Sequence, residues 1–433
     1  MLSIGPRVAM FDTPVTITVE RLRPGQKVTI SAQVEHVGGK LESFAFLTAD
    51  NHGCLDLRRD SSQGGTYEGV HPMGLFTTLQ QSANQRSGLP LVPRNIDKPM
   101  QYRFSLINGH GFHESASTID TVLVERHFMH SEVDRHQIEV GRIRGALFLP
   151  KLRADDVKLP GIIDIFGMGG GLTEHRGALL ASKGFAVLSL AYYNFRDLPT
   201  NLDEVDLNYF EGAIDWLTSQ PYVMDRIGFI GTSLGSMIAI HCGIRFPKLK
   251  AVVGINGFHG LTVFAPLTCN GVPLPTVGGN LDDVQYTDVG VSYSSFVGNI
   301  EVPEDSVLQI ETCPADTNWL LISATDDRNM CSSKSAKLLE QRLISAGKGN
   351  QIRVLHMNNA GHLLDPPFIP HCASSYSKIY DTYMAWGGEK HAHALGQDLM
   401  WRSVIDFFAT NIGAPLKLPD NDLYKSSFLK SSL

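Results

Sequence analysis

The chain has 433 residues, of which 43% are hydrophobic and 19% are charged. This composition is typical of a globular protein, and the length exceeds that of most single domains, so two domains are expected. The formal net charge of −7 argues against nucleic acid as the main partner, because phosphate binding needs a basic face. No membrane span is expected either, because no apolar run approaches the length of about 18 residues that one requires.

The first third of the chain is typical of a β-structure. Hydrophobic and polar residues alternate, or apolar runs are short, at 15–19, 28–34, 43–47, 102–107 and 121–128. Such strands without long helical segments between them predict a small antiparallel β-sandwich domain. We assign residues 1–135 to this domain.

The pattern changes near residue 140, where apolar strands begin to alternate with amphipathic helices. Strands are expected at 141–150, 160–166, 184–193, 226–231, 250–257 and 318–325, and helices at 203–219, 236–246 and 335–347. This alternation predicts an α/β domain, with a parallel sheet covered by helices on both faces. We assign residues 136–433 to it.

One short motif in this second domain is typical of a catalytic nucleophile. The sequence from Gly231 to Gly235 matches GxSxG, with Ser233 at its centre, a predicted strand before it and a predicted helix after it. A strand–turn–helix setting is what a nucleophile elbow needs, because the sharp turn lifts the serine hydroxyl clear of the sheet. A tight turn with a merely capping serine is the alternative.

Candidates for a base and an acid follow two later strands. His362 comes directly after the apolar run at 352–357, and the pair Asp326-Asp327 comes directly after the strand at 318–325. The carboxyl ends of strands are where open α/β sheets place their sites. His241, His391 and His393 lack this placement, and His241 is expected to pack within its helix. The residues alone do not separate Asp326 from Asp327.

An oxyanion hole requires two backbone N–H donors. The first expected donor is the amide of Leu234, which opens the helix after the elbow. The second is expected from Met168 or Gly169, in the glycine cluster at 167–171. The spacing of this cluster does not fit GxGxxG, so a dinucleotide cofactor is disfavoured. No cofactor or metal is expected, and the six scattered cysteines contain no CxxC pair.

Longer segments resemble a known family. They include GTYEGVHPMGLF at 65–76, GRIRGALFLP at 141–150, the glycine cluster with its flanks, the elbow, and AGHLLDPPFIPHC at 360–372. Together they resemble the acyl-CoA thioesterase / bile-acid-CoA:amino-acid N-acyltransferase family. The resemblance implies a β-sandwich in front of an α/β-hydrolase domain, acyl-CoA substrates, and Asp327 as the acid of a Ser233–Asp327–His362 triad. Leu234 and Ser236 depart from the basic residue and the glycine that family elbows usually carry.

The function that follows is hydrolysis of fatty acyl-CoA through an acyl-serine intermediate. In the family that this chain resembles, members that conjugate acyl groups to glycine or taurine carry cysteine at the elbow, whereas hydrolases carry serine. Ser233 therefore favours water over an amine as the acyl acceptor. Three alternatives remain: acyl transfer to an amine, hydrolysis of other esters, and a catalytically inactive binding protein that keeps the fold. The C-terminal Ser431-Ser432-Leu433 resembles an SKL-type peroxisomal address, which would bind a peroxisomal import receptor; a cytoplasmic location is the alternative.

Overall fold

The computed structural model describes residues 1–36, 39–82, 91, 93, 95–111, 117–151 and 158–419. The predicted address Ser431–Leu433 lies outside these residues. The chain divides into two compact units. Of the described residues, the first unit contains those within 1–130, 366–372 and Pro419, and the second unit contains those within 131–365 and 373–418. No helix in the described ranges is both long and apolar enough to cross a membrane.

The first unit is built on strands. A six-stranded sheet has the order β2(Val8–Met10), β11(Thr118–His127), β10(Met100–Asn108), β4(Lys27–His36), β5(Gly39–Thr48), β9(Gln80–Gln81). A three-stranded sheet has the order β1(Leu2–Gly5), β3(Thr16–Val19), β6(Leu55–Asp56), and β7(Ser62–Gln63) pairs with β8(Glu68–Gly69). All neighbours are antiparallel except β2 and β11, and the short helix α1(Gly74–Thr77) follows β8. The strand predicted at 28–34 is present as β4, but burial does not alternate along it, because Thr29 and Ser31 are as buried as Val28, Ile30 and Ala32.

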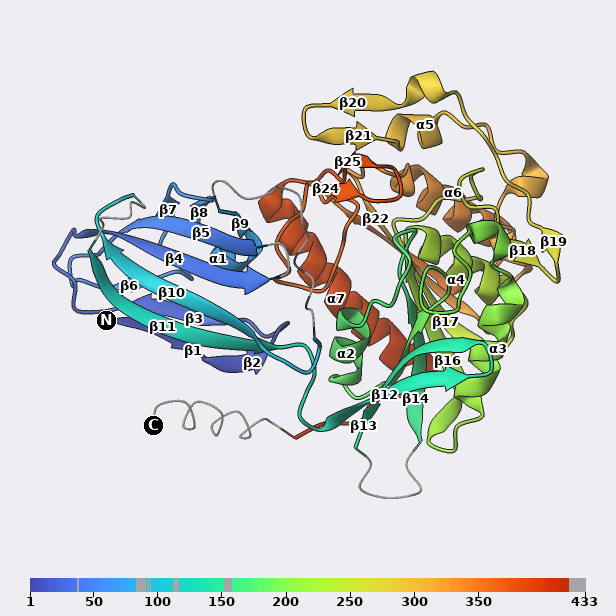
Figure 1. The fold of residues 1–433 in the computed structure, drawn as a ribbon, viewed down its shortest axis with the longest axis horizontal. Coiled ribbons are helices and arrows are strands. Elements are labelled where there is room, and N and C mark those ends of the chain that lie inside the picture. The colour runs from blue at the N-terminus through green and yellow to red at the C-terminus, as the bar shows by residue number, and fades with distance from the viewer. Residues whose placement is uncertain are drawn as a thin grey trace. The chain divides into compact units, whose positions relative to one another are not determined.

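The second unit contains an eight-stranded sheet (Figure 1). Its order is β12(Val133–Val140), β13(Ile143–Pro150), β15(Ala186–Ala191), β14(Leu159–Ile165), β16(Val223–Thr232), β17(Leu249–Ile255), β22(Asn318–Ala324), β23(Ile352–Met357). The strands from β15 to β23 in this order are parallel. The expectation of a wholly parallel sheet is wrong at one edge, where β13 is antiparallel to β12 and β15. Only antiparallel strands can be joined by a connection as short as the turn at Gly141.

Helices cover both faces of this sheet, as predicted. Their bounds are α2(His175–Ala181), α3(Leu207–Thr218), α4(Leu234–Arg245), α6(Ser332–Ser345) and α7(Lys390–Ile412). Figure 1 shows α2 and α7 on one face and α3, α4 and α6 on the other. The core on the second of these faces includes Phe210, Ile238, Leu339 and Trp319, all of which are buried. The second unit is therefore an α/β structure with its main core between the sheet and these helices.

All three predicted helices have somewhat different boundaries in the structure, and some helices, α2 and α7 among them, were not predicted; the helix predicted at 335–347 spans Ser332–Ser345. The helix predicted at 236–246 begins at Leu234, immediately after Ser233. The one predicted at 203–219 is α-helical only from Leu207, where the Asp206 side chain accepts a hydrogen bond from the amide of Asn208 at 2.9 Å. Helix α7 was not predicted, because its buried face includes polar residues such as His393 and Gln397 and so lacks a clear apolar period.

Strands from two distant stretches form a further, four-stranded sheet in the second unit. Its order is β20(Gln285–Thr287), β21(Gly290–Ser292), β25(Thr382–Ala385), β24(Ser374–Ser377). The stretch after β17 also contains β18(Thr268–Cys269), β19(Val272–Pro273), α5(Ser294–Gly298) and the 3₁₀ turns η2(Leu281–Asp283), η3(Glu304–Ser306) and η4(Ile310–Thr312). Two more 3₁₀ turns are η1(Leu202–Glu204) and η5(Gly349–Gln351). The residues predicted to be irregular, 259–317, thus contain short elements only.

Candidate active site

The predicted elbow is a sharp turn between β16 and α4. Ser233 has φ 58° and ψ −124°, a backbone conformation that non-glycine residues rarely adopt. The flanking glycines are required by space, since a Cβ on Gly231 would lie 2.0 Å from the carbonyl oxygen of Gly235. A Cβ on Gly235 would lie 2.5 Å from the carbonyl oxygen of Phe166. A strained serine in such a turn is typical of a functional site.

The departure at Ser236 is accommodated by two further glycines. A Cβ on Gly254 would lie 2.6 Å from Ser236 Oγ, and a Cβ on Gly257 would lie 2.4 Å from it. Ser236 is itself buried. The larger residue therefore fits behind the elbow because β17 and the turn after it present no side chains there.

The loop after β14 approaches the elbow closely. A Cβ on Gly167 would lie 2.9 Å from Ser233 Cβ, so only glycine fits at this position. The Tyr192 hydroxyl donates to the carbonyl oxygens of Phe166 and Gly167, at 3.1 and 2.9 Å. Burial raises the pKa of Tyr192 well above its usual value, which keeps this hydroxyl protonated as a donor. The loop is thereby held against Ser233.

The amides of this loop divide into two pairs. Those of Gly170 and Gly171 donate to the carbonyl oxygens of Gly167 and Tyr193. Those of Met168 and Gly169 make no hydrogen bond to another group in the described part of the chain. Met168 and Gly169, either of which was predicted as the second oxyanion donor beside Leu234, thus both have an amide that no described group accepts.

A buried ion pair joins this loop to the elbow, and the sequence analysis did not identify it. Arg176 Nε donates to Asp164 Oδ1 at 2.8 Å, and its other nitrogens donate to Thr232 Oγ1 at 2.6 Å and to the carbonyl oxygen of Ile165 at 2.7 Å. The Arg176 and Asp164 side chains are 1% and 3% exposed. One guanidinium therefore fixes the ends of β14 and β16 to each other. In the sequence, this ion pair could have been suspected from Asp164, an aspartate inside the apolar strand predicted at 160–166.

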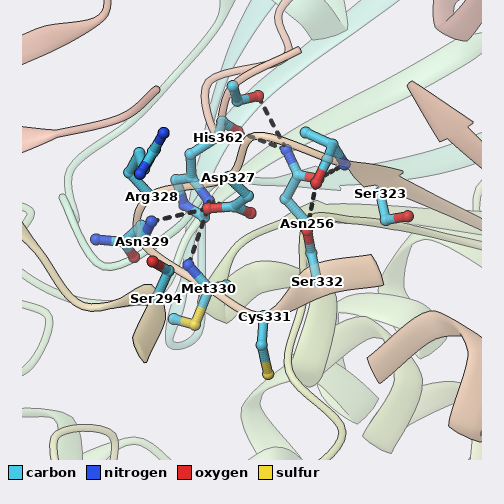
Figure 2. Close-up of polar contacts among 12 residues, drawn as sticks. Asn256, Ser294, Ser323, Asp327, Arg328, Asn329, Met330, Cys331, Ser332 and His362 are labelled. Atoms are coloured by element: carbon cyan, nitrogen blue, oxygen red, sulfur yellow. Dashed lines mark hydrogen bonds and ion pairs between the residues drawn. The ribbon is translucent and has the colours of Figure 1, made fainter. Parts of the chain in front are cut away.

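The predicted acid and base are brought together. His362 Nδ1 lies 2.9 Å from Asp327 Oδ2 and 3.0 Å from Asp327 Oδ1, and both side chains are buried (Figure 2). Asp327 Oδ1 also accepts the amides of Asn329 and Met330, at 2.9 and 2.8 Å. Because Nδ1–H donates to the carboxylate, Nε2 is the ring nitrogen left to act as a base.

The neighbouring carboxylate points elsewhere. Asp326 Oδ1 lies 2.6 Å from Arg328 Nε, and Asp326 Oδ2 accepts the amide of Gly388 at 2.8 Å. The geometry thus separates the two aspartates that the residues alone left open, and it is Asp327 that contacts His362.

The loop that carries His362 is held on several sides. The backbone amide of His362 donates to the carbonyl oxygen of Trp386 at 2.8 Å. The Trp386 indole stacks on the His362 imidazole with 5.5 Å between ring centroids. His393 Nδ1 accepts the amide of Gly361 at 3.1 Å, and His393 Nε2 donates to the carbonyl oxygen of Leu363 at 3.1 Å. His393, rejected as a base, therefore supports the residue selected as the base.

Of the other two rejected histidines, His241 lies in the predicted place. His241 is buried in α4, where its Nδ1 accepts a hydrogen bond from Arg245 at 2.9 Å. Burial and the Arg245 charge lower the pKa of His241 to about 3, so this ring stays neutral.

These groups together have the elements of serine-dependent acyl transfer. They are a hydroxyl in a strained turn, an imidazole oriented by a carboxylate, and a glycine-rich loop that packs against the serine and has two amides without a partner among the described residues. A hydrogen bond between Ser233 Oγ and the His362 ring is not among the contacts of these described residues. Catalytic hydrogen bonds are often formed only once substrate is bound.

Comparison with known proteins identifies the family. Residues 12–140 match the model described as the acyl-CoA thioester hydrolase/BAAT N-terminal region, and residues 205–414 match BAAT / acyl-CoA thioester hydrolase C terminal. Human acyl-coenzyme A thioesterase 1 is 34% identical over 93% of this chain and 94% of its own length. Mouse bile acid-CoA:amino acid N-acyltransferase is 34% identical over 97% of this chain and 98% of its own. Mouse peroxisomal succinyl-coenzyme A thioesterase is 32% identical over 95% and 97%. The chain belongs to the acyl-CoA thioester hydrolase/BAAT family.

Proposed function

We propose that this chain is a serine-dependent thioesterase that hydrolyses fatty acyl-CoA to a free fatty acid and CoA. The observation that carries the proposal is the buried His362–Asp327 pair in a chain whose elbow holds a serine in a strained turn. Names among the relatives support hydrolysis of CoA thioesters, because one is an acyl-coenzyme A thioesterase and another is a succinyl-coenzyme A thioesterase.

In the proposed first half-reaction, Ser233 Oγ attacks the thioester carbonyl while His362 Nε2 takes its proton. Asp327 holds the imidazole and stabilises the cation that forms. The developing oxyanion is stabilised by the amide of Leu234 and by that of Met168 or Gly169. The carbon–sulfur bond then breaks, the thiol of CoA leaves with the proton from His362, and the acyl group remains on Ser233.

In the second half-reaction, His362 removes a proton from water, which attacks the acyl-serine ester. The ester bond breaks, Ser233 regains its proton from His362, and the fatty acid leaves. Acyl-CoA and water are the only reactants that these two steps consume, and Ser233 and His362 regain their starting protonation states.

Transfer of the acyl group to glycine or taurine is the second candidate, because one relative is an N-acyltransferase. An acyl group on cysteine is a thioester, which amines attack readily, whereas an acyl group on Ser233 is an oxygen ester, which is less prone to aminolysis. The serine therefore favours hydrolysis.

Thiol release from acyl-CoAs of graded chain length tests the proposal. We expect wild type to release CoA without an amine, and Ser233→Ala to lose this activity by at least about a thousandfold, as for nucleophiles in other serine hydrolases. Ser345→Ala, an exposed serine at the end of α6, is the matched control and should retain full activity. Thiol release only in the presence of glycine or taurine would favour the acyltransferase. No thiol release from any acyl-CoA, with or without an amine, would reject both functions.

For the domain organisation, we propose a β-sandwich domain at 1–135 and an α/β-hydrolase domain at 136–433. The two sheets of the first unit and the separate family models for 12–140 and 205–414 support this division. Limited proteolysis followed by mass spectrometry checks it, because cleavage between the domains should leave two resistant fragments.

A peroxisomal location is proposed from the C-terminal Ser431-Ser432-Leu433. One relative is named as peroxisomal, which supports the proposal. A fluorescent protein fused to the N-terminus should enter peroxisomes and bind their import receptor, and deletion of Leu433 should abolish both. A fusion that stays diffuse with the tail intact would favour the cytoplasm.

A further inference from the structure

The turn at the end of β17 contacts the elbow, the loop of His362 and the strand that leads to Asp327. Strand β17 lies between β16, which leads to the elbow, and β22, which leads to Asp327. The carbonyl oxygen of Ile255, the last residue of β17, accepts the amide of Ser233 at 2.8 Å. The amide of the next residue, Asn256, donates to the carbonyl oxygen of Ile322 in β22 at 2.8 Å. The backbone of this turn therefore joins the nucleophile's strand to the acid's strand.

The side chain of Asn256 extends this connection to the histidine (Figure 2). Its Nδ2 donates to the carbonyl oxygen of His362 at 2.7 Å, and its Oδ1 accepts the amide of Ala324, at the end of β22, at 2.7 Å. Asn256 is fully buried, with 0% of its surface exposed. A single buried amide group thus bridges the end of β22, which leads to Asp327, and the loop of His362.

The position is specific for asparagine on two grounds. Its φ of 51° lies in the left-handed region, which asparagine tolerates better than most residues. Its two contacts need one donor and one acceptor on a short side chain, which the asparagine amide supplies. Aspartate has the same shape but would place a second acceptor against the carbonyl oxygen of His362. Glycine would keep the backbone conformation and remove both contacts.

We propose that Asn256 is a positioning residue that aligns His362 with Asp327, and so with Ser233, through its hydrogen bonds to the His362 loop and to the end of β22. The inference rests on the proposed function of these three residues. A displacement of about 1 Å in a catalytic group can cost about a hundredfold in rate, so a loosened His362 loop should lower kcat while the binding of acyl-CoA is kept.

The test compares Asn256→Asp and Asn256→Gly with wild type at pH 8. The matched controls are Asn318→Asp and Asn318→Gly, because Asn318 also donates to backbone carbonyls but lies at the opposite end of β22. Measured quantities are kcat and KM for acyl-CoA hydrolysis, the rate at which an alkyl fluorophosphonate labels Ser233, and the thermal unfolding transition. Labelling reports on the serine and its base independently of the natural substrate.

We expect both Asn256 variants to lower kcat and the labelling rate by about ten- to a hundredfold, with KM within about threefold of wild type. The aspartate variant should be the slower of the two, because it opposes the His362 carbonyl with a second acceptor. A packing role predicts the reverse order, since aspartate fills the space of asparagine and glycine leaves it empty. The Asn318 variants should match wild type.

Three results would overturn the proposal. They are wild-type rates in both Asn256 variants, a glycine variant slower than the aspartate variant, and loss of the folded protein in both, which would make Asn256 a residue of general stability. A wild type that labels at Ser233 but hydrolyses no acyl-CoA would instead reject the proposed function, and the labelling rates would still decide the role of Asn256.

Discussion

Replacing Arg176 with methionine should destabilise the second unit strongly. The guanidinium is 1% exposed, and its removal leaves the carboxylate of Asp164, 3% exposed, without its counter-charge. Breaking a buried ion pair in this way costs about 3–5 kcal/mol. The contacts to Thr232 Oγ1 and to the carbonyl oxygen of Ile165 are lost as well, so we expect the upper part of this range. The double variant Asp164→Asn/Arg176→Met leaves no buried charge and should cost less than the sum of the two single variants.

Urea unfolding followed by tryptophan fluorescence measures this cost, since all four tryptophans lie in the second unit. The matched control is Arg402→Met, which breaks an ion pair with Asp398 whose side chains are 68% and 40% exposed. An exposed pair contributes no more than about 1 kcal/mol. An Arg176→Met variant as stable as Arg402→Met, or a double variant that costs the full sum, would refute the reasoning.

Other predictions address the nucleophile, the loop beside it and the pH dependence of stability. Ser233→Cys should form N-acylglycine from acyl-CoA and glycine, because amines attack an acyl-cysteine readily; mass spectrometry of the products checks this, and an absence of amide contradicts it. Gly167→Ala should lower kcat by at least about tenfold, since its Cβ would lie 2.9 Å from Ser233 Cβ, whereas Gly212→Ala, with nothing within 4 Å, should not. Burial, and then the charge of Lys334, lower the pKa of His259 from 6.5 to about 4. Because the unfolded chain then binds a proton at this histidine more readily than the folded chain does, the free energy of unfolding falls as the pH drops from 6.5 towards 4. Above pH 6.5 the ring is neutral in both states and the folded state keeps its full stability. Between pH 7 and pH 5, the free energy of unfolding of wild type should fall by about 2 kcal/mol more than that of His259→Gln. Equal falls in urea unfolding would exclude His259 as a source of this pH dependence.

Much of the proposed site could be predicted from the sequence because its signals are local. The elbow is defined within five residues by two glycines around a serine, and the strand before it and the helix after it are continuous apolar patterns. His362 and the aspartate pair were found because each follows directly on an apolar strand. Helix α7 was missed because it buries polar residues, and the antiparallel direction of β13 was not predicted because a strand's direction leaves no trace in its own composition.

The sequence by itself therefore determined the alternation of strands and helices, the turn at Ser233 and the neighbourhood of the proposed acid and base. Only the tertiary structure decided which aspartate contacts His362, since Asp326 and Asp327 are adjacent and differ in where the chain turns each carboxylate. It alone revealed Arg176 and Asn256 as buried links, because their partners Thr232 and His362 lie 56 and 106 residues away along the chain. Periodicity records what a residue does with its near neighbours, whereas a buried hydrogen bond depends on distant segments that meet only when the sheet has formed.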